Sequence, residues 1–244
     1  MLTRLLLVFL FFLVFYPLYA IYKPPKLLIR YFAYRWPDVL WEVDVPKGRK
    51  VIALTIDDAP SEHTEEILKV LKENDARATF FVIGAQAKTR EMTLNKMISQ
   101  GMELANHAMH DEPARALPIE TLEKQILDVK VMIDSAYSLV GRERPARRYY
   151  RPGSGFFNVE MREMAKKLGY QIALGGVYPH DPQVPYAWIN ARHIYSMVRP
   201  GALVICHDRR GWTAPMLRKV LPWLKKKGWQ VVTLSELVEI GKKG

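Results

Sequence analysis

The chain has 244 residues and 49% of them are hydrophobic, so it is long enough to bury one full core. Its 36 Lys and Arg residues against 25 Asp and Glu residues give a formal net charge of +11, which permits binding to anionic surfaces. No motif that reads nucleic acid accompanies these charges, and the single cysteine, Cys206, excludes an intrachain disulfide.

The first element is an uncharged stretch, residues 5–22, that is rich in Leu, Phe, Val and Tyr. Its length is at the lower limit for a membrane helix of about 18–20 residues, and its composition is also typical of a signal peptide. We therefore expect residues 1–22 to be a signal anchor or a signal peptide, and the poor cleavage site at residues 18–20 favours the anchor. The proline-rich residues 23–48 are expected to be a linker that packs against the domain or the membrane surface.

In residues 49–244, short apolar runs alternate with amphipathic helical stretches. The expected strands are 51–56, 79–83, 102–105, 148–151, 171–174, 203–206 and 230–234. The expected helices are 62–73, 89–100, 119–139, 159–168, 189–198, 214–227 and 235–240. About seven β/α units in one domain predict a barrel-like α/β fold.

Two adjacent carboxylates, Asp57 and Asp58, follow the first of these strands. Successive strand residues point to opposite sides, so such a pair has either one idle member or two members with different functions. Ala59 and Pro60 then end the strand. Both carboxylates are thus left at a strand exit, where α/β folds place their catalytic groups.

His107, His110 and Asp111 follow the strand at 102–105, and imidazole and carboxylate groups are a ligand set for a borderline metal such as zinc. If this segment turns helically, His107 shares a face with either His110 or Asp111. The spacing alone therefore leaves the partner of His107 open.

Three further strand exits carry candidates for chemistry. Arg151, a fork-shaped partner for a carboxylate, precedes the segment 152–155, whose glycines let backbone N–H groups approach a ligand. Asp181 lies between two prolines in the segment that follows the strand expected at 171–174, and His207 ends an apolar strand. A single such histidine is more often a core residue, but this one is the fifth candidate at successive strand exits.

These five segments resemble the five motifs of the polysaccharide deacetylase family (the NodB homology domain, carbohydrate esterase family 4). The resemblance extends from about residue 50 to residue 237, and the motifs match at residues 55–60, His107, residues 151–155, Asp181 and residues 205–207. It implies a distorted (β/α) barrel. It also implies a hydrolase that removes N-acetyl groups from an N-acetylglucosamine polymer such as chitin and releases acetate.

The resemblance also implies a role for each catalytic residue. Asp57 is the base that takes a proton from water, and Arg151 keeps it ionised and oriented. The backbone N–H of Ser154 helps to bind the oxyanion. His207, oriented by Asp181, donates a proton to the leaving amine.

Asp58, His107 and a third residue are the implied ligands of a divalent metal, with Zn²⁺ as the expected ion. The family spacing places the third ligand four residues after His107, where this chain has Asp111 instead of a histidine. An Asp oxygen is an acceptable zinc ligand, so Asp111 is expected and His110 is the alternative. An aromatic residue that the family has next to Asp181 is Pro182 here, which bears on the choice of substrate.

Two other functions stay open at this point. One is an O-deacetylase of acetylxylan, or a cyclic-amide hydrolase, on the same scaffold. The other is a membrane-tethered glycan-binding protein whose metal site has decayed, which the altered second motif favours.

The expected partners are an N-acetylated polysaccharide and, through the N-terminal segment, a membrane. Basic residues are denser after residue 22 than before residue 5, which by the positive-inside rule favours a cytosolic domain. The location of the substrate is the stronger constraint. We therefore expect a protein that is membrane-anchored toward the secretory lumen or cell exterior, or secreted.

Overall fold

The computed structural model describes residues 2–243. The strands are β1 (Val39–Leu40), β2 (Val51–Ala59), β3 (Ala78–Val82), β4 (Glu103–Asn106), β5 (Arg148–Tyr150), β6 (Tyr170–Ala173), β7 (Leu203–His207) and β8 (Gln230–Val232). The helices are α1 (Leu2–Tyr22), α2 (Lys26–Arg35), α3 (Thr64–Glu73), α4 (Gly84–Ala87), α5 (Glu91–Ser99), α6 (Ile119–Val140), α7 (Val159–Lys167), α8 (Ala187–Met197), α9 (Thr213–Lys226) and α10 (Leu234–Lys242). Two short 3₁₀ turns are η1 (Ala114–Ala116) and η2 (Gly153–Gly155).

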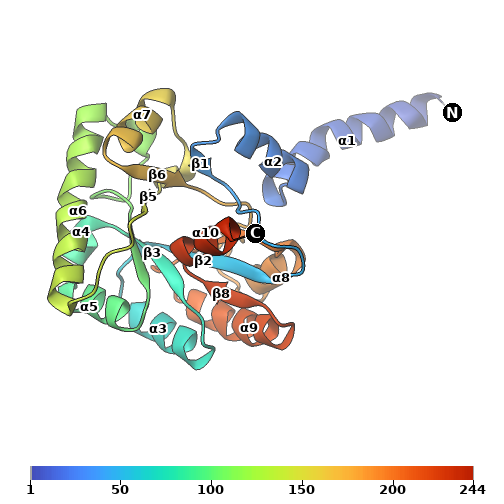
Figure 1. The fold of residues 1–244 in the computed structure, drawn as a ribbon. Coiled ribbons are helices and arrows are strands. Elements are labelled where there is room, and N and C mark those ends of the chain that lie inside the picture. The colour runs from blue at the N-terminus through green and yellow to red at the C-terminus, as the bar shows by residue number, and fades with distance from the viewer. Residues whose placement is uncertain (1, 244) are drawn as a thin grey trace.

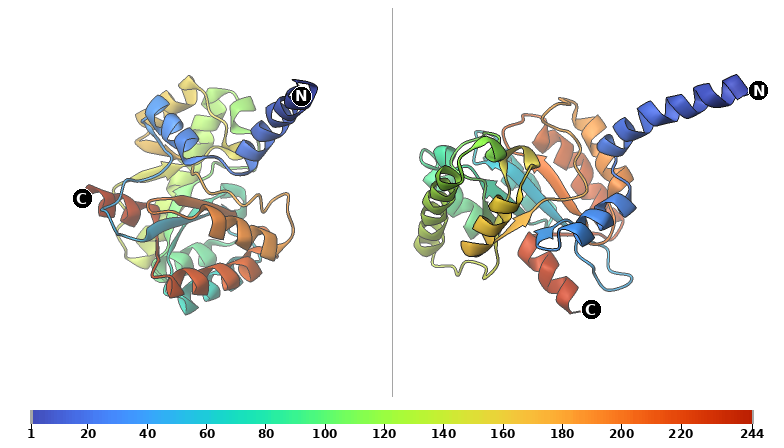
Figure 2. Two further views of the ribbon diagram at one scale, coloured as in Figure 1. Left: turned by 90° about the vertical axis from the view of Figure 1, so that its right-hand side faces the viewer. Right: turned by 90° about the horizontal axis from the view of Figure 1, so that it is seen from above.

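The strands form one parallel sheet in the order β1-β6-β5-β4-β3-β2-β7, and β8 pairs with the first residues of β2 on the side away from β7. Isolated bridges from Glu42 to Ala202 and from Val177 to Val204 connect the two ends of this row. The sheet therefore curls into a distorted barrel, with helices around its outer face (Figures 1 and 2). All carboxyl ends of the strands meet at one rim, which is the usual place for a catalytic site.

The alternation along β2 divides the core into two parts. Val51 and Ala53 pack inside the barrel, together with Leu234 and Leu237 of α10, so this helix closes one end of the interior. Ile52, Leu54 and Ile56 face the outer helices and join a larger apolar cluster with α3 and α9. A strand buried on both faces is a continuous apolar run, which is what residues 51–56 are.

The predicted α/β barrel is confirmed in its main features. The seven predicted strands correspond to β2–β8 with ends that differ by at most three residues, and the predicted helices agree to within two residues. The segment 23–48, expected to be a linker, contains α2 and also β1, whose Val39 pairs with Ile172 and whose Leu40 pairs with Ala173. The sheet therefore begins ten residues before the predicted boundary at residue 49.

The predicted N-terminal anchor corresponds to α1, which projects away from the barrel (Figure 2). No helix in the described part of the chain combines the length and the hydrophobicity needed to cross a bilayer. At the end of α1, the ring of Tyr22 stacks on His180 with 5.2 Å between ring centroids and meets His193 edge-on at 4.8 Å. His180 Nε2 also donates to the Tyr22 carbonyl oxygen, 3.2 Å away. These contacts join α1 to the loop that contains Asp181.

Candidate active site

A cleft of about 540 Å³ opens at the carboxyl ends of the strands, and seven of the eight predicted site residues line it. They are Asp57, Asp58, His107, Asp111, Arg151, Ser154 and His207. The eighth, Asp181, is fully buried and hydrogen-bonded to His207. The structure thus brings together residues that are up to 150 positions apart in the sequence.

Asp57 and Asp58 both face the cleft although they are neighbours on β2. Asp58 has φ = +60°, and the register between β2 and β3 shifts between Ile56 and Ala59. This irregularity breaks the alternation of side chains, so both carboxylates turn to the same side. A non-glycine residue with positive φ is a strained conformation that is often found at functional sites.

The guanidinium of Arg151 is the best-connected group in the site. It lies 2.5 Å from Asp57 Oδ1, and it also donates to Thr55 Oγ1 at 2.9 Å. Its remaining N–H groups donate to the carbonyl oxygens of Ala173 and Leu174. Arg151 is only 2% exposed, so this ion pair is shielded from water and both partners are fixed in orientation.

His107 and Asp58 form the second buried pair. His107 Nε2 lies 3.6 Å from Asp58 Oδ1, and both side chains are less than 10% exposed. His107 Nδ1 donates to the carbonyl oxygen of Arg151, 2.7 Å away, which leaves the Nε2 lone pair directed at the cleft. Burial raises the pKa of the Asp58 carboxyl, and the neighbouring His107 opposes that rise. A divalent cation between these two groups would supply the missing counter-charge.

The predicted third ligand has a different environment. Asp111 is exposed on the wall of the cleft, where its carboxylate pairs with Arg209 Nη1 at 3.0 Å. His110 lines a neighbouring cavity and not the cleft. Within residues 2–243, no three His, Cys, Asp or Glu side chains are gathered closely enough to hold a metal ion. The donor set of one imidazole and two carboxylates still fits a zinc-like ion by its chemistry.

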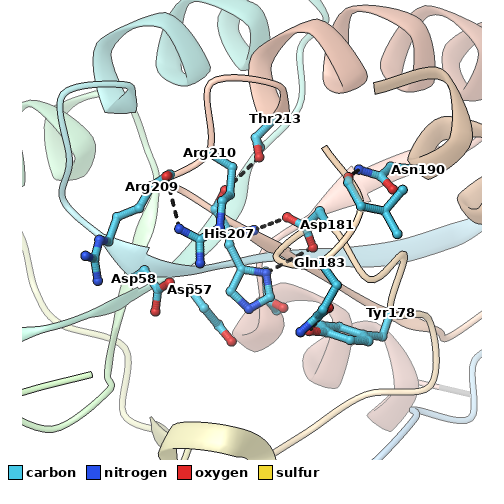
Figure 3. Close-up of polar contacts among 12 residues, drawn as sticks. Asp57, Asp58, Tyr178, Asp181, Gln183, Asn190, His207, Arg209, Arg210 and Thr213 are labelled. Carbon is cyan, nitrogen blue, oxygen red and sulfur yellow. Dashed lines mark hydrogen bonds and ion pairs between the residues drawn. The ribbon is translucent and has the colours of Figure 1, made fainter. Parts of the chain in front are cut away.

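His207 and Asp181 form the opposite side of the cleft, as Figure 3 shows. Asp181 accepts from His207 Nδ1 at 3.0 Å and from the His207 backbone N–H at 2.8 Å. Burial alone would lower the pKa of His207, but the attraction of Asp181, with Asp57 and Asp58 nearby, raises it above its ordinary value. The protonated form of His207 is therefore favoured, and within residues 2–243 its Nε2 makes no hydrogen bond and is available to a substrate.

Ser154 lies in the turn η2, next to the cleft. Its φ of +64° is again in the left-handed region. Gly153 before it approaches the chain so closely that a Cβ atom would lie 2.1 Å from the carbonyl oxygen of Glu112. The glycine is therefore required for the turn that brings Ser154 to the cleft.

Several functional neighbours were missed by the sequence reasoning. Trp41, Tyr178, Gln183 and Arg210 also line the cleft, and Asp208 lies directly behind it. Asp208 could have been predicted from the sequence, because it directly follows His207 at the strand exit. Trp41 and Arg210 come from segments without a periodic pattern, so the sequence does not indicate that their side chains point into the cleft.

Comparison with known proteins agrees with this geometry. A family profile described as polysaccharide deacetylase matches residues 44–173. A peptidoglycan-N-acetylglucosamine deacetylase of Bacillus cereus is 33% identical over 210 residues, which cover 82% of this chain and 92% of the relative. A chitooligosaccharide deacetylase of Sinorhizobium fredii is 29% identical, with 78% of this chain and 92% of the relative covered.

A solved structure shares the fold. The peptidoglycan deacetylase PdaC from Bacillus subtilis superposes with a TM-score of 0.73 at 30% identity, covering 82% of this chain and 95% of that chain. The family profile covers more than half of this chain. The match with the B. cereus relative covers 82% of this chain and 92% of the relative. The chain therefore belongs to the polysaccharide deacetylase family.

Proposed function

We propose that this protein is a metal-dependent deacetylase that hydrolyses the acetamide of N-acetylglucosamine units in a polysaccharide and releases acetate. The observation that carries the proposal is the pair of acid–base groups across one cleft. Asp57 is held by Arg151, and His207 is held by Asp181. A base and an acid placed on opposite sides of one cleft are what amide hydrolysis requires.

The residues available for a divalent ion are Asp58, His107 and Asp111, with Zn²⁺ as the expected metal. When bound, such an ion polarises an acetyl oxygen and lowers the pKa of water toward about 7. His107 is ready for this role because its hydrogen bond to the Arg151 carbonyl fixes the tautomer.

The remaining steps belong to side chains of this chain. Asp57 takes one proton from the attacking water, and the buried Arg151 guanidinium orients it for that transfer. The Ser154 backbone N–H donates to the acetyl oxygen as negative charge develops there. His207 Nε2 then gives its proton to the leaving amine nitrogen as the C–N bond breaks, and Asp181 stabilises the imidazole throughout.

The relatives support an N-acetylated glycan as the substrate, since one is named for peptidoglycan N-acetylglucosamine and another for chitooligosaccharides. The competing function is a glycan-binding protein without activity. The ion pair between Asp111 and Arg209 favours it, because it occupies the third candidate ligand.

Acetate release from chitin oligomers, peptidoglycan and acetylxylan, each with added Zn²⁺ or with chelator, tests the proposal. We expect release from at least one of the two N-acetylated polymers, and its loss with chelator. Release from acetylxylan alone would indicate an O-deacetylase instead. Binding of the polymers without any release would indicate the inactive glycan-binding protein.

We further propose that the domain works outside the cytosol, either tethered by residues 1–22 or released from them. The location of N-acetylated cell-surface glycans supports this placement. Protease treatment of intact cells, with the lysed cells as control, tests it. Degradation of the domain only after lysis would contradict it.

A further inference from the structure

His180 sets the direction of Asp181, the partner of the candidate acid. It lies directly before Asp181 and has φ = +60°, a left-handed conformation that costs free energy in a residue other than glycine. Its carbonyl oxygen accepts from the backbone N–H groups of Gln183 at 3.0 Å and Val184 at 2.9 Å, which closes a tight turn after Asp181. The place of the buried Asp181 carboxylate therefore depends on His180 keeping this conformation.

Three rings from separate segments hold the imidazole of His180. The ring of Tyr22, the last residue of α1, stacks on it with 5.2 Å between the ring centroids. Tyr178 and His193 meet it edge-on at 4.6 Å and 5.7 Å. His180 Nε2 also donates to the Tyr22 carbonyl oxygen, 3.2 Å away. A strained residue persists where its surroundings fix it in this way.

The packing of Tyr22 extends to His193 of α8. The His193 side chain is 1% exposed, and neither of its ring nitrogens has a hydrogen-bond partner within residues 2–243. Burial, with His180 and Lys23 nearby, lowers the pKa of His193 to about 4, so its ring is neutral and presents an uncharged surface. Tyr22 meets this ring edge-on at 4.8 Å. The last ring of α1 is therefore packed against the barrel, whereas Tyr19, one turn earlier, is 57% exposed.

The contacts continue from His180 to the candidate acid. The ring of Tyr178 meets His180 on one side and lies 5.8 Å from the ring of His207. Asp181 accepts from Nδ1 and from the backbone N–H of His207, and Figure 3 shows Tyr178 and Asp181 beside that residue. A movement of His180 would therefore reach His207 by two routes, the backbone of Asp181 and the ring of Tyr178.

We propose that Tyr22 is a positioning residue for the general acid. By holding His180 in its left-handed conformation, Tyr22 keeps the Asp181 carboxylate directed at His207. This inference rests on the proposed function and adds to it a residue that does not line the cleft. The carbonyl oxygen of Asp181 is held separately by Trp212 Nε1 at 2.8 Å, so the loss of Tyr22 should misorient the carboxylate without releasing it.

Tyr22→Ala in the full chain should lower kcat by about tenfold, which is less than the about 10²–10⁴-fold cost of removing an acid, and should leave KM within about twofold. A misoriented Asp181 stabilises the protonated form of His207 less, so the alkaline limb of the pH–rate profile should move to lower pH. Tyr22→Phe keeps the ring and should restore most of the rate and the position of the limb. The matched control is Tyr19→Ala, which removes an exposed ring from the same helix and should behave as wild type.

His180→Gly tests the route of this effect. A glycine adopts the left-handed conformation without strain and lacks the ring that Tyr22 holds. Adding Tyr22→Ala to His180→Gly should therefore lower kcat by less than about twofold, and effects that multiply in the double variant would overturn the proposal. Tyr22 is in none of the apolar clusters that the described residues form, so these variants should stay folded, which thermal melts check.

Titration of the imidazoles by NMR separates this inference from the proposed function, because it needs no turnover. The signal of His207 is assigned by its absence in His207→Ala. The charged groups that most affect the pKa of His207 are Asp181 and, on β2, Asp57 and Asp58. Tyr22→Ala leaves the β2 pair in place, so a change in the midpoint reports on Asp181.

A lower midpoint of His207 in Tyr22→Ala, restored in Tyr22→Phe, supports the inference even if no acetate is released. An unchanged midpoint in Tyr22→Ala would overturn it whatever happens to kcat. A midpoint in Tyr22→Phe as low as that in Tyr22→Ala would also overturn it, because the argument rests on the ring.

Discussion

His107 Nδ1 donates to the backbone carbonyl oxygen of Arg151, 2.7 Å away, while the guanidinium of the same arginine pairs with Asp57. One residue at the end of β5 therefore orients both the candidate metal ligand and the candidate base. Metal binding and proton transfer thus depend on the same arginine but use different side chains. Single substitutions of those side chains should therefore separate the two functions.

Asp57→Asn should lower kcat by about 10²–10⁴-fold while the metal content of the purified protein stays unchanged, because Asp57 is the base and not a ligand. Asp58→Asn should lose both the activity and the bound metal. Kinetics and elemental analysis of the two variants measure this. If Asp57→Asn loses metal as fully as Asp58→Asn, the division of roles between the two carboxylates is wrong.

His207→Ala should slow turnover by about 10²–10⁴-fold through loss of the general acid. The pKa of His207 is raised in the folded protein, chiefly by Asp181 working against burial, so its acid form persists to higher pH and activity should fall as pH rises through that pKa. His207→Ala should therefore abolish the alkaline limb of the pH–rate profile. Asp181→Asn should move this limb to lower pH, and a limb that stays in place in both variants would assign His207 to the core.

Asp111→Ala should weaken metal binding severely, by at least about 100-fold, since even the loss of residues behind a ligand costs about 10–100-fold. His110→Ala should have little effect on metal binding, because His110 lines the cavity beside the cleft and not the cleft itself. Arg209→Ala is the control, and it should leave affinity equal or higher because it frees the Asp111 carboxylate. Metal titration that shows severe loss in His110→Ala and none in Asp111→Ala would reverse the assignment.

Asp208 should make stability depend on pH in a specific window. It is fully buried, and burial raises its pKa to about 6 although Thr64 and Ser61 donate to it. Because this pKa lies above the unfolded value near 3.8, the folded protein binds the Asp208 proton more tightly than the unfolded chain does. The free energy of unfolding should therefore be higher below about pH 4 and fall by about 3 kcal/mol as the pH rises through 6. Urea unfolding between pH 4 and 7 should show this slope in wild type and a smaller one in Asp208→Asn. Identical slopes would contradict the prediction.

The sequence allowed the barrel and much of the cleft to be predicted because the relevant signals are local. Each strand is a short apolar run, and most of the predicted catalytic residues lie within a few positions of a strand end, as His207 does on β7. Parallel strands align these ends, so the assembly of the site follows from the fold class.

The features that were missed depend on backbone conformation or on distant contacts. The positive φ of Asp58, which turns two neighbouring carboxylates to one side, has no signature in residue type. Trp41 enters the cleft from a segment that has no periodic pattern. The pairing of Asp111 with Arg209 joins residues 98 positions apart, so spacing around His107 gave no indication of it.

The short strand β1 has a practical consequence for producing the protein. A version truncated to begin at residue 49 would lack Val39 and Leu40, so the edge of β6 would be left uncovered and ready to pair with another molecule. It would also lack Trp41 and the buried Ile29, which pack in the same apolar cluster. Such a protein should aggregate, and a soluble version is best started before Lys26, where α2 begins.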